Sequence, residues 1–486
     1  MAASSPIRAV LLSTYELGRQ PFGLASPAAW LREANVEVMC TDLAVEQLNE
    51  DAIRAADLIA FYLPMHTATR LALRHFDRVR WLNPSAHICF YGLYASMNES
   101  YLRRLGAQSI LGGEFEERLV AIANLVREQG RGVQQDPDEP VISVARQRFL
   151  TPDRSGLPPL ERYAKLQVGH ETRVVGYTEA SRGCRHLCRH CPIVPVYGGR
   201  FRIVQRDVVL EDVRAQVAAG ARHITFGDPD FFNGPSHSIA IVTALHEEFP
   251  ELTYDVTIKI EHLRKNRELL PVLRDTGCLF VISAVEAIDD ITLTALDKQH
   301  TRDDFVAVVK DFRDVGLNLT PTFVTFSPWT TLASYAELLA TIEALDLIDH
   351  VAPIQYAIRL LIPAGSRLLE LPDIQRIIGP FDEKALVYPW EHPDPRVDAL
   401  HQTVLQAVGE ATTKDESRRA VFSDVWELTH RAVAASFRQS REGAPVLAAG
   451  PEPGAAVPHL TEPWYCCAEP TEDQLLLAPS EPGKSV

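Results

Sequence analysis

The chain has 486 residues, of which 46% are hydrophobic and 23% are charged, a composition typical of a globular protein with two or three domains. Its formal net charge of −16 repels nucleic acid backbones, so we expect no nucleic acid partner. No apolar run reaches the roughly 18 residues that span a membrane, and the N-terminus lacks a signal-peptide core. We therefore expect a cytoplasmic protein without a membrane partner.

Residues 1–130 alternate short apolar runs with helical patterns, which is typical of a doubly wound, Rossmann-like parallel sheet. The strand-like runs include 8–13, 57–63 and 86–92. Ligands of such a sheet bind at the carboxyl ends of its strands. His66 follows one of these ends, and we expect it to be a surface histidine.

Three cysteines, Cys184, Cys188 and Cys191, follow a linker at 131–172 that is rich in Pro, Asp, Gln and Arg. Their C-x3-C-x2-C spacing supplies three thiolates, and a [4Fe–4S] cluster held by three thiolates keeps one iron open for another ligand. A Cys3His zinc site completed by His186 or His190 is the alternative. The position of the motif, between a strand and a series of strand–helix repeats, favours the cluster.

The repeats predict a parallel sheet with helices between its strands over residues 173–365, with chemistry at the carboxyl ends of the strands. Six strand-like runs lie at 173–181, 222–227, 253–260, 278–285, 318–326 and 351–361. The cysteine motif comes directly after the first of them.

Residues 366–440 are predicted to be helical, and 441–486 to form a flexible tail rich in Pro, Gly, Ala and Glu. Within that tail, Cys466 and Cys467 lie in the apolar block Trp-Tyr-Cys-Cys-Ala-Glu-Pro. Adjacent thiols can chelate a soft metalloid such as trivalent arsenic, can form a vicinal disulfide for redox exchange, or can be ordinary residues of a docked tail.

The cysteine motif, in the run Ser-Arg-Gly-Cys-Arg-His-Leu-Cys-Arg-His-Cys-Pro, and the strand repeats resemble the radical S-adenosylmethionine (SAM) superfamily. The resemblance implies a (β/α)6 partial TIM barrel and a [4Fe–4S] cluster whose open iron binds SAM. Residues 1–130 resemble a cobalamin-binding domain but lack the Asp-x-His-x-x-Gly motif that supplies an axial ligand, which leaves cobalamin open.

The tail resembles that of a radical SAM subfamily named for its Cys-Cys-Ala-Glu-Pro or selenocysteine-Cys ending. Two internal motifs, Pro-Val-Tyr-Gly-Gly-Arg-Phe-Arg and Gly-Asp-Pro-Asp-Phe-Phe-Asn-Gly, add to this resemblance.

The family resemblance also implies SAM-binding residues at the strand ends. Asp228 and Asp230 match an acidic motif that binds the amino group of SAM, and carboxylates at a strand end are well placed to receive an ammonium group. Lys259, Glu286 and Arg359 lie at or near later strand ends, where relatives contact SAM or substrate.

The resulting hypothesis is a radical SAM enzyme that cleaves SAM reductively and modifies a small molecule, by methyl or aminocarboxypropyl transfer. Cys466 and Cys467 would take part by binding a metalloid or by redox exchange. Such an enzyme needs an electron donor, for which flavodoxin or ferredoxin is expected. The alternative hypothesis is a non-catalytic iron- or zinc-binding module that acts as a redox sensor.

Overall fold

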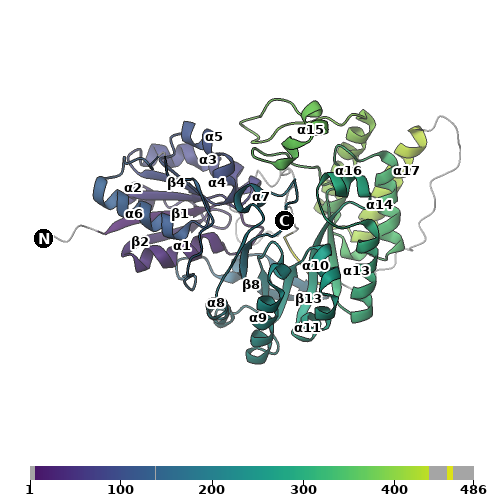
Figure 1. Ribbon diagram of the computed structural model, residues 1–486, viewed down its shortest axis with the longest axis horizontal. Helices are drawn as coiled ribbons and strands as arrows, with labels where there is room; N and C mark the ends of the chain where they lie inside the picture. Colours follow the sequence, from purple (N-terminus) through teal and green to yellow (C-terminus); the bar gives the residue numbers. More distant parts are fainter. Residues whose placement is uncertain (1–5, 137, 437–456, 463–486) are drawn as a thin grey trace.

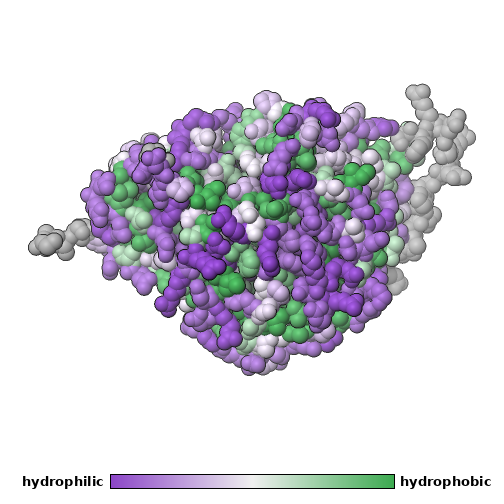
Figure 2. All heavy atoms as spheres, viewed as in Figure 1, coloured by the Kyte–Doolittle hydropathy of each residue, from purple (hydrophilic) through white to green (hydrophobic). Residues whose placement is uncertain are grey.

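The computed structural model describes residues 6–136, 138–436 and 457–462 (Figure 1). An N-terminal sheet with its helices occupies one end of the long axis, and a larger sheet with the C-terminal helices occupies the other (Figure 1). Hydrophilic residues cover most of the face seen in Figure 2, with hydrophobic residues in scattered patches between them. In the part of the chain described, no helix is long and apolar enough to cross a bilayer.

The N-terminal sheet has the strand order β2-β1-β3-β4-β5-β6, and all its strands are parallel. The strands are β1 (Ile7–Ser13), β2 (Val36–Asp42), β3 (Leu58–Tyr62), β4 (His87–Tyr91), β5 (Ser109–Gly113) and β6 (Ile142–Ser143). The order reverses between β1 and β3, which places a ligand-binding crevice at their carboxyl ends.

Helices cover both faces of this sheet, as expected for strands that are apolar on both sides. One core joins the sheet to α1 (Phe22–Glu33) and α6 (Glu116–Gln129). A second core joins its other face to α2 (Glu50–Ala55), α3 (His66–Leu82), α4 (Leu93–Met97) and α5 (Glu99–Arg104).

The second sheet has the order β14-β13-β12-β11-β8-β7-β15. Its parallel strands are β8 (Glu171–Thr178), β11 (His223–Phe226), β12 (Thr253–Thr257), β13 (Cys278–Glu286) and β14 (Asn318–Phe323). The sheet curls into a half-barrel, so the expected fold class is confirmed.

The prediction of a sixth strand at 351–361 was wrong in its extent. That segment contains a 3₁₀ turn, Pro353–Tyr356, and isolated bridges in place of a strand, among them a parallel one between Phe326 and Arg359. Pro353 has no N–H to donate to a strand ladder, which favours the turn. The third strand is also shorter than expected, because β12 ends at Thr257 and the chain enters helix α10 (Ile260–Lys265).

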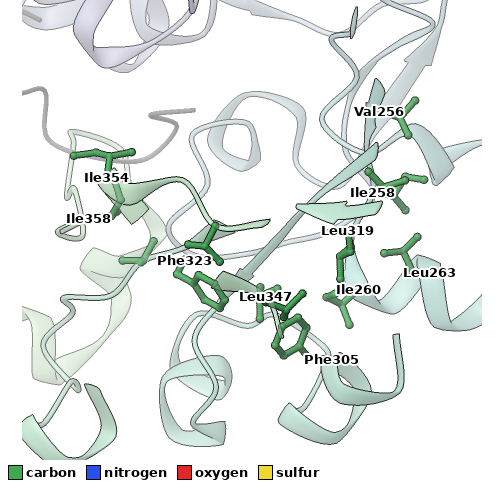
Figure 3. Close-up of a cluster of buried hydrophobic side chains, with 14 of the residues drawn as sticks. Val256, Ile258, Ile260, Leu263, Phe305, Leu319, Phe323, Leu347, Ile354 and Ile358 are labelled. Atoms are coloured by element: carbon green, nitrogen blue, oxygen red, sulfur yellow. The ribbon is translucent and has the colours of Figure 1, made fainter. Parts of the chain in front are cut away.

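Helices pack on the outside of the half-barrel around one large core. Figure 3 shows part of it, in which Leu319 and Phe323 of β14 lie near Phe305 and Ile260. The helices are α8 (Arg206–Ala218), α9 (Pro235–Glu248), α10, α11 (Leu270–Asp275), α12 (Asp290–Ala295), α13 (Arg302–Val315), α14 (Leu332–Ala344), α15 (Pro372–Ile377), α16 (Pro395–Thr413) and α17 (Arg418–Ser436).

Short elements connect the two sheets. β7 (Lys165–Val168) forms an antiparallel hairpin with β8. After β8, β9 (Ser181–Gly183) and β10 (Phe201–Ile203) form an antiparallel ribbon whose connection carries the three cysteines and α7 (Val194–Tyr197).

Part of the predicted flexible tail is docked. β15 (His459–Leu460) pairs antiparallel with β7, and the Tyr15 hydroxyl donates a 2.6 Å hydrogen bond to Oε1 of Glu462. The structure therefore fixes a tail segment beside the N-terminal domain. Cys466 and Cys467 lie outside the described residues.

Candidate active site

A cavity of about 290 Å³ lies where the carboxyl ends of the two sheets face each other. From the N-terminal sheet it is lined by residues that follow β1, β3, β4 and β5, among them Glu16, Pro64, Gly92 and Phe115. From the half-barrel it is lined by residues at the ends of β8, β11, β12 and β13, among them Glu179, Asp228, Lys259 and Glu286.

Cys184, Cys188 and Cys191 all line this cavity. The turn before them requires glycine, because Gly183 has φ +75° and a Cβ there would lie 2.4 Å from the Tyr197 ring. Burial raises the pKa of the Cys184 thiol to about 12, so a bound metal must displace its proton. Three thiols at one cavity fit the donor set of a three-cysteine [4Fe–4S] cluster.

A different donor set also converges in the cavity. One ligand atom each from Cys184, His186 and Asp230 lie within 4.8 Å of one another. The expected Cys3His alternative is not formed by His190, whose Nε2 lies 3.0 Å from Oε1 of Glu286. A zinc site here would therefore use one cysteine and a carboxylate.

Asp228 is almost fully buried after β11, and both of its oxygens hold the backbone before the cysteines. Oδ2 accepts from the Ala180 N–H at 2.8 Å, and Oδ1 accepts from the Ser181 hydroxyl at 2.6 Å. Burial raises the pKa of Asp228 to about 7 despite these bonds.

Asp230 lies between two imidazole rings. Its Oδ2 is 2.7 Å from His262 Nδ1 and 3.4 Å from His186 Nε2. Burial opposes ionisation, but these rings hold the pKa of Asp230 below its usual range. On the other side of His186, Nδ1 is 3.0 Å from the Lys259 ammonium, which places Lys259 at the edge of the same group.

Glu286 ends β13 in a strained conformation, with φ +70° at a shift in the register between β13 and β14. Its Oε1 accepts from the buried Lys298 ammonium at 3.2 Å and contacts His190. Burial works against ionisation, but the charges of Lys298 and His190 lower the pKa of Glu286 to about 2. Strain at a cavity wall of this kind is a common property of functional sites.

Residues 178–340 match the family model of the radical SAM superfamily. The chain carries a radical SAM domain. That domain comprises the cysteine loop and β11 to β14, so the residues just described from the half-barrel lie within it.

Comparisons with known proteins extend beyond this domain. The tRNA-2-methylthio-N(6)-dimethylallyladenosine synthase of Desulfosudis oleivorans is 24% identical over 302 residues, which cover 59% of this chain and 63% of the relative. The match therefore spans less than two thirds of the relative's own length.

Two solved structures share the fold. One is the cobalamin-dependent SAM radical enzyme OxsB with aqua-cobalamin and SAM bound, at a TM-score of 0.68 and 14% identity, covering 89% of this chain and 75% of OxsB. The other is the radical SAM methyltransferase TsrM from Kitasatospora setae, at a TM-score of 0.56 and 17% identity, covering 70% of this chain and 71% of TsrM. The expected resemblance to radical SAM enzymes with a Rossmann-like N-terminal domain is confirmed for the fold.

Two sequence-predicted residues lie elsewhere. Arg359 is not among the residues that line the cavity; its guanidinium pairs with Asp398 at 2.6 Å and lies over the Trp390 ring at 3.7 Å from the centroid. His66 is buried, so the prediction of a surface histidine was wrong. Its Nε2 lies 2.7 Å from the Ala385 carbonyl oxygen, and burial lowers the pKa of His66 to about 4.

Sequence reasoning missed the residue that joins the radical SAM domain to the N-terminal sheet. The buried Arg182 guanidinium contacts Glu114 at 3.2 Å, Glu116 at 2.7 Å and Glu179 at 2.7 Å. It also lies over the Phe149 ring, 4.9 Å from its centroid. A sequence feature that could have identified this contact is the acidic run directly after β5, because residues that follow such a strand lie at the ligand crevice.

The N-terminal wall of the cavity lies at the carboxyl ends of the strands, where a ligand site was expected, but the sequence did not identify its individual residues. Glu16, Phe22 and Tyr62 of the N-terminal domain line it, and Tyr177 of the half-barrel strand β8 packs against Phe22. No local spacing connects these residues, since only the folded sheets bring them together.

Proposed function

We propose that the protein is a SAM-cleaving enzyme that transfers a SAM-derived group to a small molecule held between the two sheets. The observation that carries the proposal is that Cys184, Cys188 and Cys191 all face one cavity lined by the carboxyl ends of both sheets. A [4Fe–4S] cluster at these thiols would supply the electron that breaks a C–S bond of SAM.

The surrounding residues have separate roles in this proposal. Asp228 fixes the backbone that leads into the cysteine loop, through its bonds to Ala180 and Ser181. Lys259 and Asp230 offer opposite charges at the cavity wall, which suits the carboxylate and ammonium groups of SAM. Glu286 is held ionised by Lys298 and fixes the wall at the end of β13.

Cobalamin enters no step of this proposal. Among the described residues that line the cavity from the N-terminal sheet, none is a histidine, and Nε2 of His66 is already engaged by Ala385. These described residues therefore supply no axial histidine of the kind a cobalamin-binding motif provides, and the shared fold alone assigns no ligand.

We also propose that Cys466 and Cys467 act at this cavity, as a chelator of a soft metalloid or as a redox pair. Support comes from Glu462, which is anchored to Tyr15, the neighbour of the cavity residue Glu16. Cys466 lies four positions after Glu462, and an extended chain of that length spans about 13 Å. Replacing both cysteines with serine should abolish arsenite-dependent product formation if they hold the acceptor, whereas unchanged yields would contradict this role.

The experiment uses anaerobically reconstituted protein, SAM and a flavodoxin or ferredoxin reductant, with and without arsenite. We expect a brown protein with about four irons per chain. Accumulation of 5′-deoxyadenosine would indicate an adenosyl radical, whereas methylthioadenosine would indicate transfer of the aminocarboxypropyl group. A colourless protein with one zinc per chain and no SAM cleavage would instead support the non-catalytic sensor.

A further inference from the structure

The N-terminal wall of the cavity carries a carboxyl group with an oxygen that no described residue pairs. Glu16 follows β1 and is only 7% exposed. The next two residues, Leu17 and Gly18, both have positive φ, at +53° and +67°. A non-glycine residue rarely adopts this conformation, so the turn that sets Glu16 against the cavity is strained.

No hydrogen-bond donor reaches Oε2 of Glu16 among the described residues, although the atom is buried. Within the same residues, no ion pair of 4.0 Å or less involves this side chain. A buried carboxylate without donors is unfavourable, so the wall is suited to a ligand that brings a donor. Burial, and next the charge of Glu179, raise the pKa of Glu16 well above its usual value.

Among the described residues, the acids around this point outnumber the cations that contact them. Glu114, Glu116 and Glu179 share the single guanidinium of Arg182. Arg19 faces Glu16 and lies over the Tyr177 ring, 5.0 Å from its centroid. Arg154 is paired with the buried Asp212 and therefore adds no net charge. Four carboxyl groups thus share two guanidiniums among the described residues, so a carboxyl group at the wall is left without a cation of its own.

Aromatic rings complete this wall. Tyr62 and Tyr177 line the cavity beside Glu16 and Glu179, and Phe22 packs edge-on against Tyr177 with the centroids 6.3 Å apart. The negative faces of such rings attract organic cations, most strongly where water is excluded. Carboxylates and aromatic faces together favour an ammonium group over a neutral or an anionic one.

We propose that the wall formed by Glu16, Glu179, Tyr62 and Tyr177 binds the ammonium group of the substrate, which is therefore a small amine. This assignment rests on the proposed function, since Cys184, Cys188 and Cys191 line the same cavity as the wall that would hold the amine. The α-ammonium group of SAM has the same chemistry, so the experiment must separate the two sources.

The test is calorimetric binding to the cluster-loaded protein without reductant, so that no turnover occurs. The probes are phenethylamine and its neutral counterpart 2-phenylethanol. We expect phenethylamine to bind the unmodified protein at least tenfold more tightly, because a charged hydrogen bond contributes about that factor. Glu16→Gln should remove the preference, and the exposed Glu33→Gln on α1 should retain it.

Equal affinity for the two probes, or an unchanged preference in Glu16→Gln, would overturn the amine site. Displacement of phenethylamine by SAM, together with weaker SAM binding in Glu16→Gln, would assign the wall to SAM and overturn it as a substrate site. Iron content and SAM cleavage by the unmodified protein test the proposed function separately, so failure of one proposal does not imply failure of the other.

Discussion

The two walls of the cavity differ in how their charges are satisfied. On the half-barrel side, Glu286 is paired with Lys298 and His190, and Asp228 accepts two hydrogen bonds from the chain. On the N-terminal side, Glu16 has an oxygen without a donor among the described residues. These carboxylates of the half-barrel wall have their partners within the protein. The unpaired oxygen of the N-terminal wall needs a donor from a bound ligand.

The largest effect should come from the cysteines of the half-barrel wall. Cys188→Ala should remove the cluster and lower SAM cleavage more than about a hundredfold, because two thiolates cannot hold it. Iron analysis and product quantification measure both effects. Cys40→Ala, at a buried site outside the motif, is the control and should keep its iron. Full SAM cleavage in Cys188→Ala would contradict the assignment of the thiols.

Arg182, which joins the radical SAM domain to the N-terminal sheet, should give the next largest effect, on the free energy of unfolding. Arg182→Met leaves Glu114, Glu116 and Glu179 without their shared cation, and removing one partner from buried ion pairs costs about 3–5 kcal/mol. Denaturant unfolding measures this free energy. Arg222→Met, whose side chain is 66% exposed and pairs with Glu171, should change it by less than about 1 kcal/mol. Equal losses in the two variants would show that the buried Arg182 ion pairs stabilise the protein no more than an exposed pair does.

Replacing a glutamate with glutamine should change the free energy of unfolding in opposite directions at the two walls. Glu286→Gln should lower the free energy of unfolding by about 3 kcal/mol, since Lys298 loses its carboxylate. Glu16→Gln should raise it by about 1–2 kcal/mol, because burial favours the protonated form of Glu16 and glutamine needs no proton uptake on folding. Thermal or denaturant unfolding of the ligand-free variants checks both. Destabilisation by Glu16→Gln would show that the carboxylate has a structural partner.

A smaller effect should appear as a pH dependence of stability. Burial raises the pKa of Asp228 to about 7, above the value in the unfolded chain. The folded state therefore binds the extra proton, and this residue's contribution to stability is lost as pH rises from about 4 to about 7, by at most about 1.4 kcal/mol per pH unit. Asp228→Asn should remove that slope in unfolding measurements, and the exposed Asp303→Asn should not. An identical slope in Asp228→Asn and the unmodified protein would contradict the raised pKa.

Local sequence patterns predicted the half-barrel wall well. The spacing of Cys184, Cys188 and Cys191 indicated the cluster loop, and the apolar runs indicated the strands that precede Asp228 and Glu286. These signals work because each residue lies at the end of its own strand. The prediction of the last strand was less accurate, because Pro353 and the turn that follows override the apolar pattern.

The residues of the N-terminal wall could not be read from local patterns. Glu16 and Glu179 follow strands of different sheets, and Arg182 meets Glu114 only through the packing of those sheets. The chemistry of such a wall depends on distant segments that share no spacing. Arg359 is a residue for which a local pattern was misleading. Its place late in the expected sixth strand suggested a contact with a cofactor or substrate, but its guanidinium is paired with Asp398.

The pairing of β15 with β7 has a consequence for synthesis of the chain. β7 lies at Lys165–Val168 and the strand that covers its edge lies at His459–Leu460, so β7 leaves the ribosome long before its partner. Until then, β7 presents an open ladder of N–H and C=O groups, which invites pairing with another nascent copy. Slow translation or premature termination before residue 459 therefore exposes newly made protein to edge-to-edge aggregation.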